Sequence, residues 1–92
     1  MRAPDTPSSF GAKATLNQIG NTVASMLPTT ALESYRELVS VGEFQVALEN
    51  LCTNLDDYGV VLGPDVRQAL VVACKRFELS PRYWEKLDKP VP

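Results

Sequence analysis

Four carboxylates and a neighbouring tyrosine are the side chains of this sequence whose types and spacing best suggest chemistry. They are Glu43, Glu49, Asp56, Asp57 and Tyr58. All lie in the stretch 42–59, which we predict to be helical, and the chemistry they suggest is recognition of a positively charged protein. The acids would attract and pair with Lys or Arg, and the tyrosine would supply buried contact area.

Two of these acids occupy positions that an isolated helix disfavours. Asp56 and Asp57 fall in the last predicted turn, where the helix dipole is negative and each carboxylate costs about 0.3–1 kcal/mol. No Lys or Arg lies between Arg36 and Arg67 to offset them. Two carboxylates in an unfavourable position, with no basic residue nearby in the sequence to offset them, favour a binding surface at this end of the helix. The alternative is a charged face that is simply solvated.

Catalysis is not expected from this set of residues. The chain has no histidine, so neither a Ser/His nor a Cys/His nucleophilic arrangement can form. Asp56 and Asp57 are adjacent and would point about 100° apart on a helix, which prevents them from flanking one substrate. The two cysteines are too few for a zinc site, and the five glycines are scattered rather than gathered into a phosphate-binding loop. We expect no enzyme activity, no cofactor and no metal.

Length and charge layout narrow the class of partner. A chain of 92 residues makes one domain with a modest core, and its net charge is −2 with a pI near 5.0. Residues 33–65 carry seven acids against one arginine, whereas residues 66–92 carry six bases against three acids. This layout argues against nucleic-acid binding and suits a basic protein partner. No export-type or bilayer-spanning apolar segment occurs, so we expect no membrane association and a cytoplasmic location.

The elements that must position these residues are predicted to be all helical. Residues 1–12, with several Pro, Ser and Gly, are typical of a flexible N-terminal tail, and 13–92 form a single helical domain. Apolar periodicity, glycine stops and proline starts predict four main helices and a short C-terminal one. They span residues 13–27, 31–41, 42–59, 64–77 and 80–87. The expected fold class is all-α, a compact bundle without a sheet.

Several local features accompany this assignment. Thr30 and Glu33 form a capping-box pattern at the start of the second helix. The fourth helix is apolar over so much of its circumference that we expect it to be the most enclosed. Trp84 is interpreted as the anchor of the last helix, with a partner hot spot as the alternative. Cys52 and Cys74 are interpreted as reduced core thiols, and a disulfide between neighbouring helices stays open.

The segment GEFQVALENLCTNLDDYGVVL resembles the MafI family of bacterial immunity proteins. The residues that carry the likeness are Gly42, Glu43, Ala47, Leu48, Glu49, Leu51, Cys52, Leu55, Asp57 and Tyr58, and the ending Leu79–Leu87 also resembles that family. The likeness covers roughly residues 27–87. The chain departs from the family pattern at Asp56, where an aromatic residue is expected, and at Gly59, where an acid is expected.

The resemblance implies a small cytoplasmic protein that binds and neutralises a cognate secreted polymorphic toxin domain by non-covalent contact. Such domains are often nucleases and therefore basic, which agrees with the acidic face. A helical adaptor or regulatory subunit of a larger bacterial complex is the alternative from another class. A helix-turn-helix DNA reader, with residues 66–77 as recognition helix, is a third hypothesis and is disfavoured by the acidic run before it. The sequence leaves the toxin's identity and the oligomeric state open.

Overall fold

A computed structural model describes residues 5–88 and shows an all-α fold, as the sequence predicted. Within that range there are five α-helices, one short 3-10 helix and no strand. The elements are α1 (Asp5–Val23), η1 (Ala24–Met26), α2 (Thr29–Ser40), α3 (Phe44–Asp57), α4 (Pro64–Arg76) and α5 (Pro81–Asp88). The prediction of four main helices followed by a short C-terminal helix is therefore confirmed.

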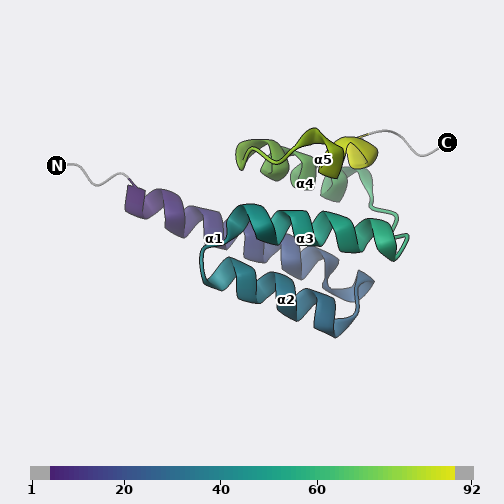
Figure 1. Cartoon of the computed structure of the whole chain (residues 1–92), viewed down its shortest axis with the longest axis horizontal. Helices are drawn as coiled ribbons and strands as arrows, with labels where there is room; N and C mark the ends of the chain where they lie inside the picture. The colour runs from purple at the N-terminus through teal and green to yellow at the C-terminus, as the bar shows by residue number, and fades with distance from the viewer. Residues whose placement is uncertain (1–4, 89–92) are drawn as a thin grey trace.

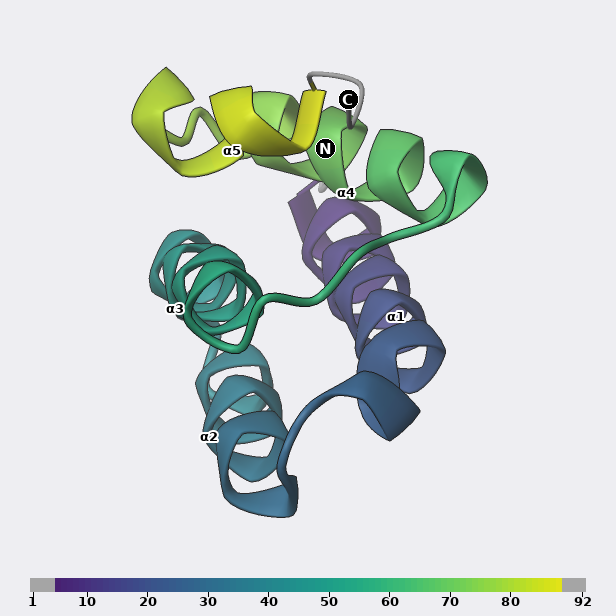
Figure 2. The ribbon, with the colours of Figure 1, turned by 90° about the vertical axis from the view of Figure 1, so that its right-hand side faces the viewer.

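The helices stack in three levels (Figure 1). α1 and α3 form the middle level, α2 packs against both on one side, and α4 with α5 covers the opposite side. Figure 2 shows α1, α2 and α3 nearly end-on, with α4 and α5 lying across them. The chain crosses from the lower levels to the upper one through the link that follows α3, so α3 is the element around which the others are arranged.

The first helix is longer at its N-terminus than the sequence predicted. α1 begins at Asp5, so the predicted tail 1–12 is wrong for residues 5–12, and residues 1–4 lie outside the described residues. Two physical reasons explain the difference. Pro7 is in the first turn, where the missing N–H is tolerated. Ala12 is buried and adds one more turn to the apolar stripe of Leu16 and Ile19.

The second helix also begins differently. Pro28 occupies the N-cap position of α2, and no side chain caps this end. The predicted capping box of Thr30 and Glu33 is therefore wrong. The first backbone bond, from the Leu32 amide to the Pro28 carbonyl at 3.1 Å, places Thr30 inside the first turn. A residue in that position cannot play the N-cap role.

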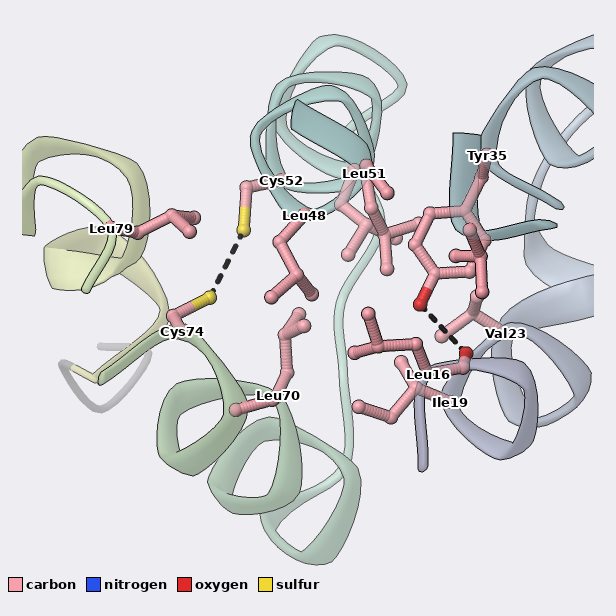
Figure 3. Packing of buried hydrophobic residues seen from close by; sticks show 14 of the residues in the cluster. Leu16, Ile19, Val23, Tyr35, Leu48, Leu51, Cys52, Leu70, Cys74 and Leu79 are labelled. Carbon is pink, nitrogen blue, oxygen red and sulfur yellow. Dashed lines mark hydrogen bonds between the residues drawn. The ribbon is translucent and has the colours of Figure 1, made fainter. Parts of the chain in front are cut away.

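The core is a single apolar cluster between the levels (Figure 3). Tyr35 is fully buried, and its hydroxyl donates to the Leu16 carbonyl at 2.7 Å, so α2 is joined to α1 inside the core. The ring lies 3.0 Å from the position that a Cβ would occupy on Gly20. A residue with a Cβ would crowd the ring, so glycine fits this position of α1. This close approach lets α1 and α2 pack tightly around one aromatic side chain.

α3 is more enclosed than α4, contrary to the prediction from apolar content. It buries five residues, Ala47, Leu48, Leu51, Cys52 and Leu55, whereas α4 buries four, Leu70, Val71, Ala73 and Cys74. Ala69 and Val72 of α4 are exposed. The reason is position, since α3 lies in the middle level with neighbours on two sides, while α4 has only the lower levels and α5 beside it.

Three helices end in the same hydrogen-bonded turn, the Schellman motif. At the end of α3 the Val60 amide donates to the Leu55 carbonyl, and Gly59 adopts a left-handed φ of 63°. Gly42 does the same after α2 with φ of 84°. After α4 the residue in this position is Glu78, with φ of 59°. A side chain with a Cβ is disfavoured in that conformation, so the turn after α4 is strained.

Replacing Glu78 with glycine is expected to stabilise the protein. The substitution removes the left-handed strain but adds freedom to the unfolded chain, which leaves a net gain of about 0.5–1 kcal/mol. Urea unfolding followed by circular dichroism measures this difference. Gly59→Ala is the converse substitution and serves as the control. No atom lies within 4 Å of the position that the new Cβ would take, so only the left-handed φ of 63° affects the stability of this variant. It should lose about 1 kcal/mol. An unchanged or lower stability of Glu78→Gly would contradict the proposed strain.

Candidate partner-binding trough between α3 and α5

A hollow of about 380 Å³ lies between α3 and α5. The described residues that line it are Cys52, Thr53, Asp56, Arg82, Tyr83 and Leu87. A second, more open hollow of about 300 Å³ lies farther back along α3 and is lined by Val46, Glu49, Asn50, Thr53, Asn54 and Tyr83. Because Thr53 and Tyr83 line both hollows, we treat them as one feature, the α3–α5 trough.

The position of α5 creates the trough, and local contacts fix that position. Leu79 is buried, and its carbonyl accepts a hydrogen bond from Trp84 Nε1 at 3.4 Å. Lys75 Nζ lies 4.9 Å from the centre of the Trp84 ring, a cation–π contact between α4 and α5. Trp84 is half-buried against the core, as its interpretation as an anchor requires. α5 is therefore held to the end of α4 while its other face borders α3.

A polar contact also holds the start of α3 to the end of α4. Gln45 Nε2 donates to the Phe77 carbonyl at 3.3 Å and to the Glu78 carbonyl at 3.2 Å. These carbonyls belong to the strained turn after α4 and lack partners within the helix. The Gln45 side chain thus provides a hydrogen-bond donor for the free carbonyls of the turn that precedes α5. This contact fixes one end of the trough.

The α5 wall of the trough carries a cationic and an aromatic group. Arg82 Nη2 donates to the Tyr83 hydroxyl at 3.2 Å, and the guanidinium carbon lies 5.0 Å from the Tyr83 ring centre. The α3 wall carries Glu49 and Asp56, seven residues apart and therefore on one stripe of the helix. Asp56 also lies at the C-terminal end of α3, where the negative helix dipole adds to its charge. The trough is thus acidic along α3, with one arginine at its α5 side.

The five predicted site residues do not form one patch. Glu49, which is half-buried, and Asp56, which is exposed, both line the trough. Glu43 is the N-cap of α3 and Tyr58 is its C-cap, so a helix of 14 residues, about 20 Å long, separates them. Asp57 is exposed but lies about 100° around the helix from Asp56. Of the five, Glu49 and Asp56 line the trough, each at a different one of its two hollows.

Sequence reasoning did not find the α5 side of the trough. Arg82, Tyr83 and Leu87 were placed on a helix, but a start signal at Ser80 and Pro81 does not say which neighbour that helix borders. The one available signal was the pairing of Arg82 with Tyr83, a cation beside an aromatic ring at the start of a short amphipathic helix. It indicates an interaction surface only after the packing of α5 is known.

Among residues 5–88, no group of three or more His, Cys, Asp or Glu side chains is arranged to hold a metal ion. In the same range, no helix has both the length and the apolar character needed to span a bilayer. No family model, no curated protein and no solved structure matches this chain. The trough is the feature on which a functional proposal must rest.

Proposed function

We propose that the protein is a cytoplasmic immunity protein that binds and neutralises a cognate polymorphic toxin domain by non-covalent contact. The proposal combines the resemblance of residues 42–62 to MafI immunity proteins with the geometry of the α3–α5 trough. The single observation that carries it is that Glu49 and Asp56 line the two adjoining hollows of this trough, both of which Tyr83 also lines.

The shape and charge of the trough favour a basic side chain as its occupant. Carboxylates on the α3 wall attract Lys or Arg, and Tyr83 adds aromatic contact area beside them. Val46 and Leu87 provide apolar contact for the aliphatic part of such a side chain. Hollows of about 380 and 300 Å³ accept one or two inserted side chains rather than a whole helix. We therefore infer that a loop of the toxin domain presents its cationic residues to the trough.

This mode of binding would neutralise a nuclease-type toxin through its own basic residues. A domain that cleaves nucleic acid needs Lys and Arg to hold phosphate groups. Residues engaged by Glu49 and Asp56 are no longer free for substrate, and the bulk of the bound protein excludes the nucleic acid from that surface. Inhibition therefore needs no chemistry from the immunity protein.

Co-expression with the neighbouring toxin domain tests the proposal. We expect the neighbouring gene to encode a large secreted protein whose C-terminal domain is lethal when expressed alone in the cytoplasm and tolerated when this chain is present. The two should also copurify as a stable complex. If the neighbouring genes instead encode an enzyme assembly and this chain copurifies with one of its subunits, the proposed function is wrong and the adaptor alternative takes its place.

A further inference from the structure

The two cysteines of the chain lie side by side although they come from different helices. Cys52 is on α3 and Cys74 is on α4, and both are free and buried. Their Sγ atoms are 3.6 Å apart and share a hydrogen bond (Figure 3). A disulfide has an S–S distance of about 2.05 Å, so the two sulfurs are within about 1.5 Å of bonding distance. Ordinary core packing does not require such a pairing.

One cysteine of this pair borders the trough. Cys52 lines the 380 Å³ hollow beside Thr53 and Asp56, whereas Cys74 is fully enclosed. The shared hydrogen bond lets one sulfur carry the negative charge while the other keeps its proton. It lowers the pKa of the Cys74 thiol, and together with burial it raises the pKa of the Cys52 thiol. The pair is therefore a hydrogen-bonded dithiol with one member at the wall of the trough.

We propose that Cys52 and Cys74 are an oxidative modification site, in which a peroxide that enters through the trough converts the thiol pair into a reversible intramolecular disulfide. The oxidant class is hydrogen peroxide or a small organic hydroperoxide, because the hollow admits molecules of that size. The site does not depend on the proposed immunity function, since both thiols and the hollow belong to the free protein.

The reaction balances with one peroxide per protein. Cys52 sulfur passes its proton to Cys74 sulfur through the shared hydrogen bond as it attacks one peroxide oxygen, and the O–O bond breaks. The leaving hydroxide takes up a proton as water, and Cys52 becomes a sulfenic acid. Cys74 sulfur then attacks the Cys52 sulfur, the S–O bond breaks, and a second water leaves with the Cys74 proton. Two thiols are oxidised, one peroxide is reduced to two waters, and a thiol reductant reverses the change.

The bond would connect two levels of the fold. α4 packs mainly against α1 and α5, and α3 packs mainly against α2, so the cysteines are a side-chain bridge between helices with little backbone contact. A disulfide there would close a loop over residues 52–74 and restrict the unfolded chain. We therefore expect the oxidised protein to be more resistant to unfolding than the reduced one.

The test uses the purified full-length chain without any partner. After exposure to hydrogen peroxide, denaturing alkylation and intact mass should show both thiols lost together, with a mass decrease of two hydrogens. Reduction should restore the starting mass. Thermal unfolding of the oxidised form should occur about 10 °C higher than that of the reduced form. The chain contains no other cysteine, so thiol loss reports on this pair alone.

Matched variants separate the proposed site from unspecific oxidation. In Cys74→Ala, Cys52 has no resolving thiol, so peroxide should give a dimedone-reactive sulfenic acid and no rise in the unfolding temperature. Cys52→Ala should leave the enclosed Cys74 unreacted under the same treatment. The proposal is overturned if wild-type thiols resist peroxide that oxidises a free peptide thiol, or if the product is a covalent dimer or a sulfinic acid. A disulfide that lowers the unfolding temperature would also overturn it.

Discussion

Removing the two trough carboxylates in Glu49→Ala/Asp56→Ala is expected to weaken binding of the cognate toxin domain by at least about 100-fold. Truncating one partner of a buried interfacial charge pair costs about 2–5 kcal/mol, because the cation opposite it stays desolvated and unpaired. Two such losses sum to about 4 kcal/mol or more, so a factor of 100, which corresponds to about 2.8 kcal/mol, allows for incomplete additivity. Titration calorimetry measures the affinity. Repeating it at high salt should show a flatter salt dependence for the variant than for the wild type.

The chain offers a control with the same change in net charge. Glu43→Ala/Asp57→Ala also removes two carboxylates from α3 or its cap, but neither residue lines the trough. Each exposed charge outside the contact contributes about 0.2–1 kcal/mol, so the two together should cost about 30-fold or less. Equal losses in both variants would assign recognition to the general acidic field of α3 instead of the trough.

A second comparison separates lost binding from lost folding. Asp56 takes part in an interaction within the folded chain, so its replacement can also affect stability. Each variant should therefore be unfolded thermally before binding is measured, and variants that remain folded at the assay temperature are compared. Full toxin affinity in a folded Glu49→Ala/Asp56→Ala protein would rule out the trough as the binding site.

Periodicity made most of this fold predictable. Six apolar residues recur along α3 at three- and four-residue steps, and five of them are buried while Phe44 is half-buried. Val46 lies off this stripe and is exposed. Gly42 and Gly59 were predicted to stop helices, and both adopt the left-handed conformation that a Schellman turn requires. These features depend on a few neighbouring residues, so one sequence is enough to recognise them.

The features that sequence reasoning missed depend on contacts between distant residues. Gly20 lowers the helix propensity of α1, and it is the position that admits the Tyr35 ring, fifteen residues away. Glu78 occupies a position where glycine would be expected, and its turn is supported by Gln45 from the start of α3. The trough also depends on contacts between distant residues, because its two walls are about thirty residues apart in the chain. No local pattern encodes such a pairing.

Replacing Tyr35 with alanine is expected to have the largest effect on stability. The ring is fully buried between α1 and α2, so its loss leaves a cavity and costs about 3–5 kcal/mol. A domain of this size has a total of about 5–15 kcal/mol, so Tyr35→Ala should be partly unfolded at room temperature or close to it. Urea unfolding provides the measurement. A loss below about 1 kcal/mol would mean that the ring does not hold α1 and α2 together.

Tyr35→Phe isolates the hydroxyl and predicts a distinctive pH dependence. Near neutral pH the variant should be about 1 kcal/mol less stable, because the bond to the Leu16 carbonyl is lost. Burial, with smaller contributions from the nearby cysteines, raises the pKa of Tyr35 above its ordinary value of about 10. Above that pH the unfolded chain releases the phenolic proton while the folded protein keeps it, so folding loses about 1.4 kcal/mol per pH unit through this group.

Phenylalanine has no proton to release, so the stability advantage of the wild type should shrink above about pH 10 and reverse by about pH 11. Urea midpoints for the two proteins, measured from pH 7 to about pH 11.5, give the comparison. Other titrating groups, including both cysteines, are common to both chains, and most of their contribution cancels in the difference. A difference that stays constant across this range would show that the Tyr35 hydroxyl ionises as readily in the folded protein as in the unfolded one. The hydroxyl would then have to be open to solvent, and the α1–α2 contact around Leu16 and Gly20 would have to be looser than the close approach of the ring to Gly20 implies.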